Sequence, residues 1–158
     1  MAEKLQYDPI SAENFENIRI IVSEVRTTLQ SLPGTNNSQK YALLYDNDSL
    51  VQDNLLLIKA LTKAPAIDNL NGSPRGLRLA LANHELYLDV PEQVVADYKD
   101  SLTDKILAVG RELNALNLRM ANPNYVERAP AHLVLETKQQ IEEKEQLISR
   151  LKTQQSLI

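Results

Sequence analysis

Residues 102–120, LTDKILAVGRELNALNLRM, decide the fold of the C-terminal part of this 158-residue chain. Apolar residues recur there at alternating steps of four and three, which is the heptad spacing of a helix that packs along a narrow seam. The members of this first seam are Leu102, Ile106, Val109, Leu113, Leu116 and Met120. A second seam begins after Pro130 and is interrupted by polar residues: Val134, Thr137, Ile141, Lys144, Ile148, Leu151, Gln155 and Ile158.

The connection between the two seams is short, because Asn122-Pro123-Asn124 ends the first helix and the second starts after Pro130. Two heptad helices joined by a short turn must run antiparallel. The pattern therefore predicts an antiparallel coiled-coil arm over residues 91–158, with its tip at 121–130. Helices of about 30 residues would make this arm roughly 45 Å long.

Upstream of the arm the apolar period changes several times. Phe15, Ile18, Val22, Val25 and Leu29 form one stripe, which predicts a helix over about 11–31 that ends at Leu32-Pro33-Gly34. The segments that follow are predicted as a strand at 41–45, a helix from about 49 to 63, a strand at 65–70, and a hairpin of strands at 77–81 and 86–90 with a tight turn at Asn83-His84.

The predicted fold class is therefore α+β. A small β-α-β-β domain at 34–90 is preceded by a helical segment at 1–33 and followed by the long antiparallel α-helical coiled-coil hairpin at 91–158. Arg19 and Arg26 lie beside the apolar stripe of the first helix, where a solvated face is the simpler interpretation unless the helix belongs to an RNA-binding surface.

Composition excludes several classes of chemistry. The chain has no Cys, which excludes disulfides, thiolate metal sites and a cysteine nucleophile. Its only histidines, His84 and His132, lie far apart and are each more simply surface residues than members of a small hydrolase site. No apolar run approaches the roughly 20 residues of a membrane span. We expect a soluble cytoplasmic protein with no catalytic residues, metal or cofactor.

The tip holds the most informative polar residues. Arg119 and Arg128 flank it, with Tyr125 between them. A cation and an aromatic ring at the end of a rigid arm suit contact with RNA phosphates and bases. The alternative is that Tyr125 and Val126 close the open end of the seam. The net charge of −4 gives no sign of a nucleic-acid binder by itself.

A specific resemblance covers the tip and its flanks. Residues 118–134, LRMANPNYVERAPAHLV, resemble the turn of the C-terminal coiled coil in bacterial valyl-tRNA synthetases, approximately L-x-x-x-N-x-x-[FY]-V-x-[KR]-A-P-x-x-[VL]-[VL]. Residues 21–26 resemble the last helix of that family's anticodon-binding bundle, and 41–45 the strand after it. The family usually has a second Arg three residues after the position of Arg26, where this chain has Leu29.

The resemblance implies an arm that reaches the outer corner of L-shaped tRNA. It implies tip contacts from Arg119, Asn122, Asn124, Tyr125 and Arg128, with a valine-specific tRNA and the catalytic part of a parent synthetase as partners. The family's ATP-binding motifs are absent from this sequence, so the chain would be a noncatalytic, monomeric C-terminal part or a stand-alone relative of a class I synthetase.

A second function class is a coiled-coil module for protein interaction or self-assembly, without RNA binding. Thr137, Lys144 and Gln155 interrupt the second seam and could be accommodated by a second hairpin.

Overall fold

A computed structural model describes residues 9–34 and 36–158, with side chains described from residue 12 onward. It is an α+β structure, which confirms the predicted class. The chain divides into two compact units, Met1–Val95 and Ala96–Ile158, each of which is described by itself. One long helix, α5 (Glu92–Ala121), begins at the end of the first unit and continues into the second.

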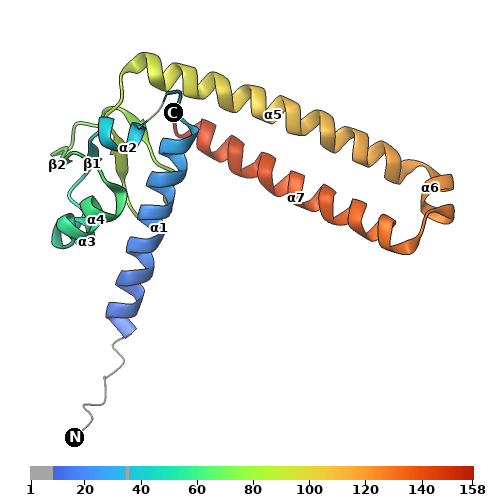
Figure 1. Ribbon diagram of the computed structural model, residues 1–158, viewed down its shortest axis with the longest axis horizontal. Helices are drawn as coiled ribbons and strands as arrows, with labels where there is room; N and C mark the ends of the chain where they lie inside the picture. The colour runs from blue at the N-terminus through green and yellow to red at the C-terminus, as the bar shows by residue number, and fades with distance from the viewer. Residues whose placement is uncertain (1–8, 35) are drawn as a thin grey trace, which may run out of the picture. The chain divides into compact units, whose positions relative to one another are not determined.

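The first unit contains a four-stranded mixed sheet with helices around it (Figure 1). Its helices are α1 (Pro9–Ser31), α2 (Asn37–Lys40), α3 (Ser49–Asp53) and α4 (Leu55–Thr62). Its strands are β1 (Leu43–Tyr45), β2 (Ile67–Asn69), β3 (Leu77–Arg78) and β4 (Leu86–Leu88). The strand order is β2-β1-β4-β3, with β1 parallel to β2 and antiparallel to β4. The predicted β-α-β-β order is therefore present.

The core of this unit consists of aliphatic side chains from the central strands and from one face of α1. Every residue of β1 and β4 is buried. The predicted α1 stripe is confirmed at Ile18, Val22, Val25 and Leu29, and wrong at Phe15, which is 64% exposed. Figure 1 gives the reason, because the first turns of α1 extend beyond α3 and α4.

The helix predicted over 49–63 is divided at Asn54 into α3 and α4. Asp48 caps α3, because its Oδ1 accepts the Val51 N–H at 3.0 Å. The Asn54 backbone N–H donates to the Val51 carbonyl at 3.1 Å and its Nδ2 donates to the Leu50 carbonyl at 2.8 Å. These short-range bonds compete with the regular helical ladder and end α3.

The tight hairpin turn predicted at Asn83-His84 is wrong. Leu77 pairs with Leu88, and the Leu79 N–H donates to the Leu86 carbonyl at 2.9 Å, so the connection runs from residue 80 to 85. His84 lies within this connection, and its Nδ1 is 2.5 Å from Asp48 Oδ2. The side chain is only 15% exposed, so its interpretation as a surface residue is also wrong.

Gly76 occupies a position that a larger residue cannot fill without rearrangement. Its φ is +76°, and a Cβ there would lie 2.0 Å from the Leu88 carbonyl oxygen. Gly72 has φ +85° with open space around its Cα. We expect Gly76→Ala to lower the free energy of unfolding by about 1–3 kcal/mol more than Gly72→Ala. Both substitutions place an alanine in the left-handed backbone conformation, but only the Cβ at position 76 clashes with the Leu88 backbone. Urea denaturation of the two variants checks this, and equal midpoints would contradict it.

The second unit is a helical hairpin formed by α5 (Glu92–Ala121), α6 (Pro123–Arg128) and α7 (Ala131–Ser156). The helices α5 and α7 lie side by side in opposite directions, with α6 at the turn (Figure 1). No residue of either predicted seam is exposed, and four are buried: Leu102, Leu116, Thr137 and Leu151. Both seams are confirmed.

The three polar residues of the second seam all have partners within the hairpin. Thr137 Oγ1 is 2.8 Å from Tyr125 Oη, Lys144 forms an ion pair with Glu112, and Gln155 Nε2 donates to Thr103 Oγ1 at 2.6 Å. These pairs are separated by 12, 32 and 52 residues along the chain. The sequence separation of the paired residues grows with distance from the tip, as it must when two antiparallel helices are joined by a turn.

The tip is not the loop that the sequence analysis predicted, because it contains the short helix α6. Asn122 Oδ1 accepts the Asn124 N–H at 3.1 Å, and Pro123 occupies the first turn. Asn followed by Pro both ends one helix and starts another, since Asn is a favoured N-cap and Pro is favoured at the first helical position.

Candidate nucleic-acid interface

The five residues predicted to contact RNA lie together at the end of the hairpin. Arg119 is in the last turn of α5, Asn122 caps α6, and the others belong to α6. The Arg119 guanidinium carbon lies 5.7 Å from the centre of the Tyr125 ring, within the range of a cation–π contact. Arg119, Asn122, Asn124 and Arg128 are exposed, and Tyr125 is half-buried. Of these four exposed side chains, Arg119 is the one that the structure places against the Tyr125 ring.

Tyr125 is attached to α7 through its hydroxyl group. Its Oη lies 2.8 Å from Thr137 Oγ1 and 3.2 Å from the Leu133 carbonyl oxygen. The hydroxyl group thus connects Tyr125 to a seam residue of α7, whereas Val126, which the alternative interpretation also placed at the end of the seam, is 42% exposed. The Tyr125 ring remains partly accessible beside Arg119, so contact with a base stays compatible with this position.

Asn122 has a structural role as the N-cap of α6. We expect Asn122→Ala to weaken the hairpin locally by about 1 kcal/mol, because the Asn124 N–H then loses its acceptor. Faster amide hydrogen exchange across α6, compared with Asn124→Ala, is the measurement. Unchanged exchange in Asn122→Ala would contradict the assignment of Asn122 as a cap.

Apolar side chains also reach the surface near the tip. Leu118, Val126 and Leu133 are all exposed, Leu118 by 65%. Sequence reasoning placed Val126 at the end of the seam and did not assign the two leucines. The available signal was their spacing, since Leu118 and Leu133 lie outside the heptad positions of both seams.

A groove on the hairpin continues from Arg119 toward the middle of the arm. It is lined by residues from both long helices, among them Glu112 and Arg119 on α5 and Glu143 and Lys144 on α7. Two acidic and two basic side chains leave the groove without a dominant charge.

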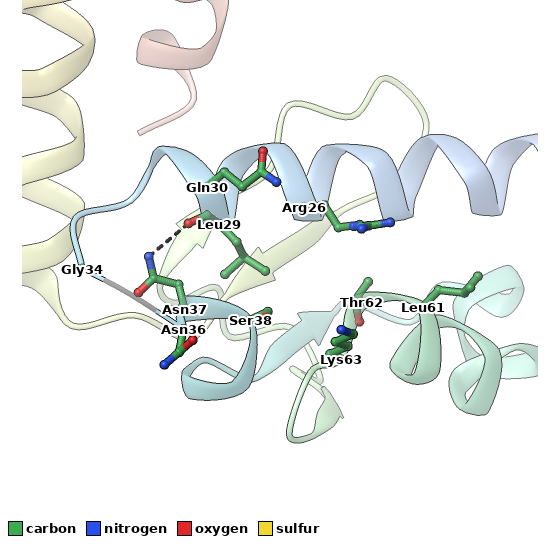
Figure 2. Close-up of a pocket in the computed structure, with 10 residues that line it drawn as sticks. All are labelled: Arg26, Leu29, Gln30, Gly34, Asn36, Asn37, Ser38, Leu61, Thr62 and Lys63. Atoms are coloured by element: carbon green, nitrogen blue, oxygen red, sulfur yellow. Dashed lines mark hydrogen bonds between the residues drawn. The ribbon is translucent and has the colours of Figure 1, made fainter.

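The first unit has a separate pocket, shown in Figure 2, between the end of α1, α2 and the end of α4. Arg26 and Lys63 line it. The Asn37 Nδ2 donates to the Leu29 and Leu32 carbonyls at 3.1 and 3.2 Å, which satisfies carbonyls at the end of α1. This side chain therefore holds the chain after α1 against the helix.

Arg19, the other basic residue beside the α1 stripe, is engaged on the surface. Its Nε and Nη2 donate to the two Glu16 carboxylate oxygens at 2.9 and 2.6 Å. This hydrogen bonding lowers the pKa of Glu16 and raises the pKa of Arg19. The arrangement agrees with a solvated face.

The histidines do not form a shared site. His84 pairs with Asp48, whereas His132 is exposed in the first turn of α7. Within residues 9–34 and 36–158, no three His, Asp or Glu side chains are grouped so that they could hold a metal ion. No helix in this part of the chain is long and apolar enough to cross a membrane.

Known proteins similar to this chain include valine–tRNA ligases. Residues 95–158 match the family described as the valyl tRNA synthetase tRNA binding arm. The valine–tRNA ligase of Petrotoga mobilis is 25% identical over 149 residues, which are 90% of this chain and 17% of the relative. That of Thermotoga maritima is 23% identical over 156 residues, 96% of this chain and 18% of the relative. The chain thus spans less than a fifth of these relatives, and its residues 95–158 are similar to the tRNA-binding arm of valyl-tRNA synthetases.

Proposed function

We propose that the chain is a tRNA-binding, noncatalytic C-terminal appendage of a valine–tRNA ligase. In this proposal, residues 1–33 end the anticodon-binding region, residues 34–90 form a small linking domain, and residues 91–158 form an antiparallel coiled-coil arm that contacts the outer corner of tRNA. The family match over residues 95–158 is the observation that carries it, together with exposed Arg119 beside the Tyr125 ring and exposed Arg128 at the end of α6.

The tip residues suit contact with folded RNA. Arg119 and Arg128 can each donate several N–H groups to phosphate oxygens, and the Asn124 amide can bond phosphate or ribose. The partly exposed ring of Tyr125 offers a surface on which a base could stack. Contacts of this kind recognise the shape of tRNA more than its sequence, so we assign the choice of a valine tRNA to the parent synthetase.

Charge limits the affinity of the isolated chain. The net charge is −4, and neutralisation of phosphates supplies most of the affinity in such complexes. We therefore propose weak binding by the chain alone and a larger contribution when it is tethered to the catalytic part, through effective concentration. With tRNA and a synthetase as partners, the protein would work in the cytoplasm.

Titration of the whole chain into a fluorescent valine-tRNA transcript tests this proposal. We expect binding at about 50 mM salt and roughly tenfold weaker binding at about 200 mM, as the release of counterions from two phosphates predicts. A transcript of another tRNA should bind with similar affinity. Absence of binding at the lower salt concentration would refute tRNA binding by this chain.

The self-assembly alternative is less well supported. In that alternative, a second hairpin supplies partners for the polar seam residues Thr137, Lys144 and Gln155. All three already have partners in their own hairpin. We expect a monomer in sedimentation equilibrium at micromolar concentration. A concentration-dependent dimer would favour the alternative.

A further inference from the structure

Thr137 occupies a seam position at which an apolar side chain would be expected, and it is only 3% exposed. Its Oγ1 donates to the Leu133 carbonyl at 2.9 Å in the preceding turn of α7. The same oxygen is 2.8 Å from Tyr125 Oη on α6. A buried hydroxyl group thus joins the short helix at the tip to the long helix behind it.

Tyr125 connects Thr137 to the predicted RNA-contacting surface. The hydroxyl end of Tyr125 is bonded at Thr137, and the guanidinium carbon of Arg119 lies 5.7 Å from the centre of its ring. A change in the orientation of this ring would therefore move the surface on which the Arg119 guanidinium rests. The order of contacts is Thr137, Tyr125, Arg119, from the buried seam to the exposed tip.

We propose that Thr137 is a positioning residue for tRNA binding: its hydroxyl group fixes the Tyr125 ring, and through the ring the Arg119 side chain, in the orientation that meets RNA. This inference rests on the proposed function of the arm. Thr137 itself is buried and makes no RNA contact. Its contribution is to restrict the tip before binding, so that less side-chain freedom is lost when the complex forms.

The positioning role is separable from a general role in the stability of the hairpin. Thr137→Val keeps the volume and the methyl group while it removes the hydroxyl. The Tyr125 hydroxyl then retains the Leu133 carbonyl as an acceptor, at 3.2 Å. We therefore expect the melting temperature to change little, and tRNA affinity to fall about three- to tenfold, the range of one lost hydrogen bond.

A double-mutant cycle on the whole chain, with binding to the valine-tRNA transcript as the readout, tests the inference. Thr137→Val and Tyr125→Phe should weaken binding by similar factors, and the combined variant should bind no more weakly than either one. Thr137→Ser should bind like the wild type, because it restores the hydroxyl group. The slope of affinity against salt concentration should be unchanged in all of them, since no phosphate contact is removed.

The results separate this inference from the proposed function. If the wild-type chain does not bind tRNA at low salt, the proposed function fails. If the wild type binds while Thr137→Val and Tyr125→Phe bind equally well, the positioning role is overturned and tRNA binding stands. Additive losses, or failure of Thr137→Ser to restore affinity, would also overturn it. Should Thr137→Val not fold, Tyr125→Phe with Thr137→Ser still decides the question, because Tyr125→Phe removes the same bond from the other side.

Discussion

Replacing both arginines at the tip, Arg119→Ala with Arg128→Ala, is expected to weaken tRNA binding about tenfold or more at low salt. Both guanidinium groups are exposed at the end of the hairpin, where they can reach phosphates. Each lost phosphate contact should also reduce the slope of log affinity against log salt by about 1. Fluorescence titrations at several salt concentrations measure both effects.

A matched control separates a local contact from general electrostatics. Arg150 and Lys152 are exposed near the other end of α7, and replacing both by Ala changes the net charge by the same amount. We expect this control to bind almost like the wild type. Equal weakening in the two double variants would mean that total charge, and not the tip, determines affinity.

Leu44→Ala is expected to lower the free energy of unfolding by about 2–5 kcal/mol. Leu44 is fully buried in the central strand β1, where it is paired with Tyr87 of β4 and belongs to a cluster with Leu70. Truncation removes apolar contacts and leaves a cavity, and a small sheet has little capacity to close around it. Urea denaturation followed by circular dichroism measures the change.

Leu56→Ala is the control for this experiment because it removes the same atoms from a side chain that is 85% exposed. We expect an effect of about 0.5 kcal/mol or less. If Leu44→Ala were no more destabilising than Leu56→Ala, β1 would not lie at the centre of the core.

The hairpin could be predicted in detail because its signals are local and repetitive. Heptad spacing identified both seams, and Pro130 marked the start of α7. The order of strands and helices in the first unit also followed from changes in apolar period. Such patterns indicate which face of a helix or strand is buried, and this is enough to predict how a few helices and strands pack together.

The errors arose where a side chain has a specific partner that periodicity does not reveal. The Asn54 side chain donates a hydrogen bond to a backbone carbonyl and divides the predicted helix. His84, which was predicted in a tight turn, pairs instead with Asp48. Phe15 follows the α1 stripe but is 64% exposed. For Asn54 and His84 the apolar pattern was present, and a hydrogen-bond partner decided the local structure.

In the candidate site, too, the exposed residues were predictable from the sequence and a buried hydrogen-bond partner was not. Sequence reasoning identified the exposed residues of the tip, because the resemblance extends through residues 118–134. It treated Thr137 as an irregularity in the seam, since its partner, Tyr125, lies 12 residues earlier across a turn. Only the three-dimensional arrangement shows that the two hydroxyl groups meet.

The most direct test of the central claim is a site-specific crosslink from the tip to tRNA. The chain has no native Cys, so Asn124→Cys gives a single attachment point for a photoreactive benzophenone, and Ser149→Cys on α7 gives a control far along the chain from the tip. Primer extension then maps the crosslinked nucleotides. We expect crosslinks from position 124 confined to the D and T loops at the outer corner of tRNA, and few from position 149. Crosslinks from position 124 in the anticodon stem, or equal labelling from the two positions, would contradict it.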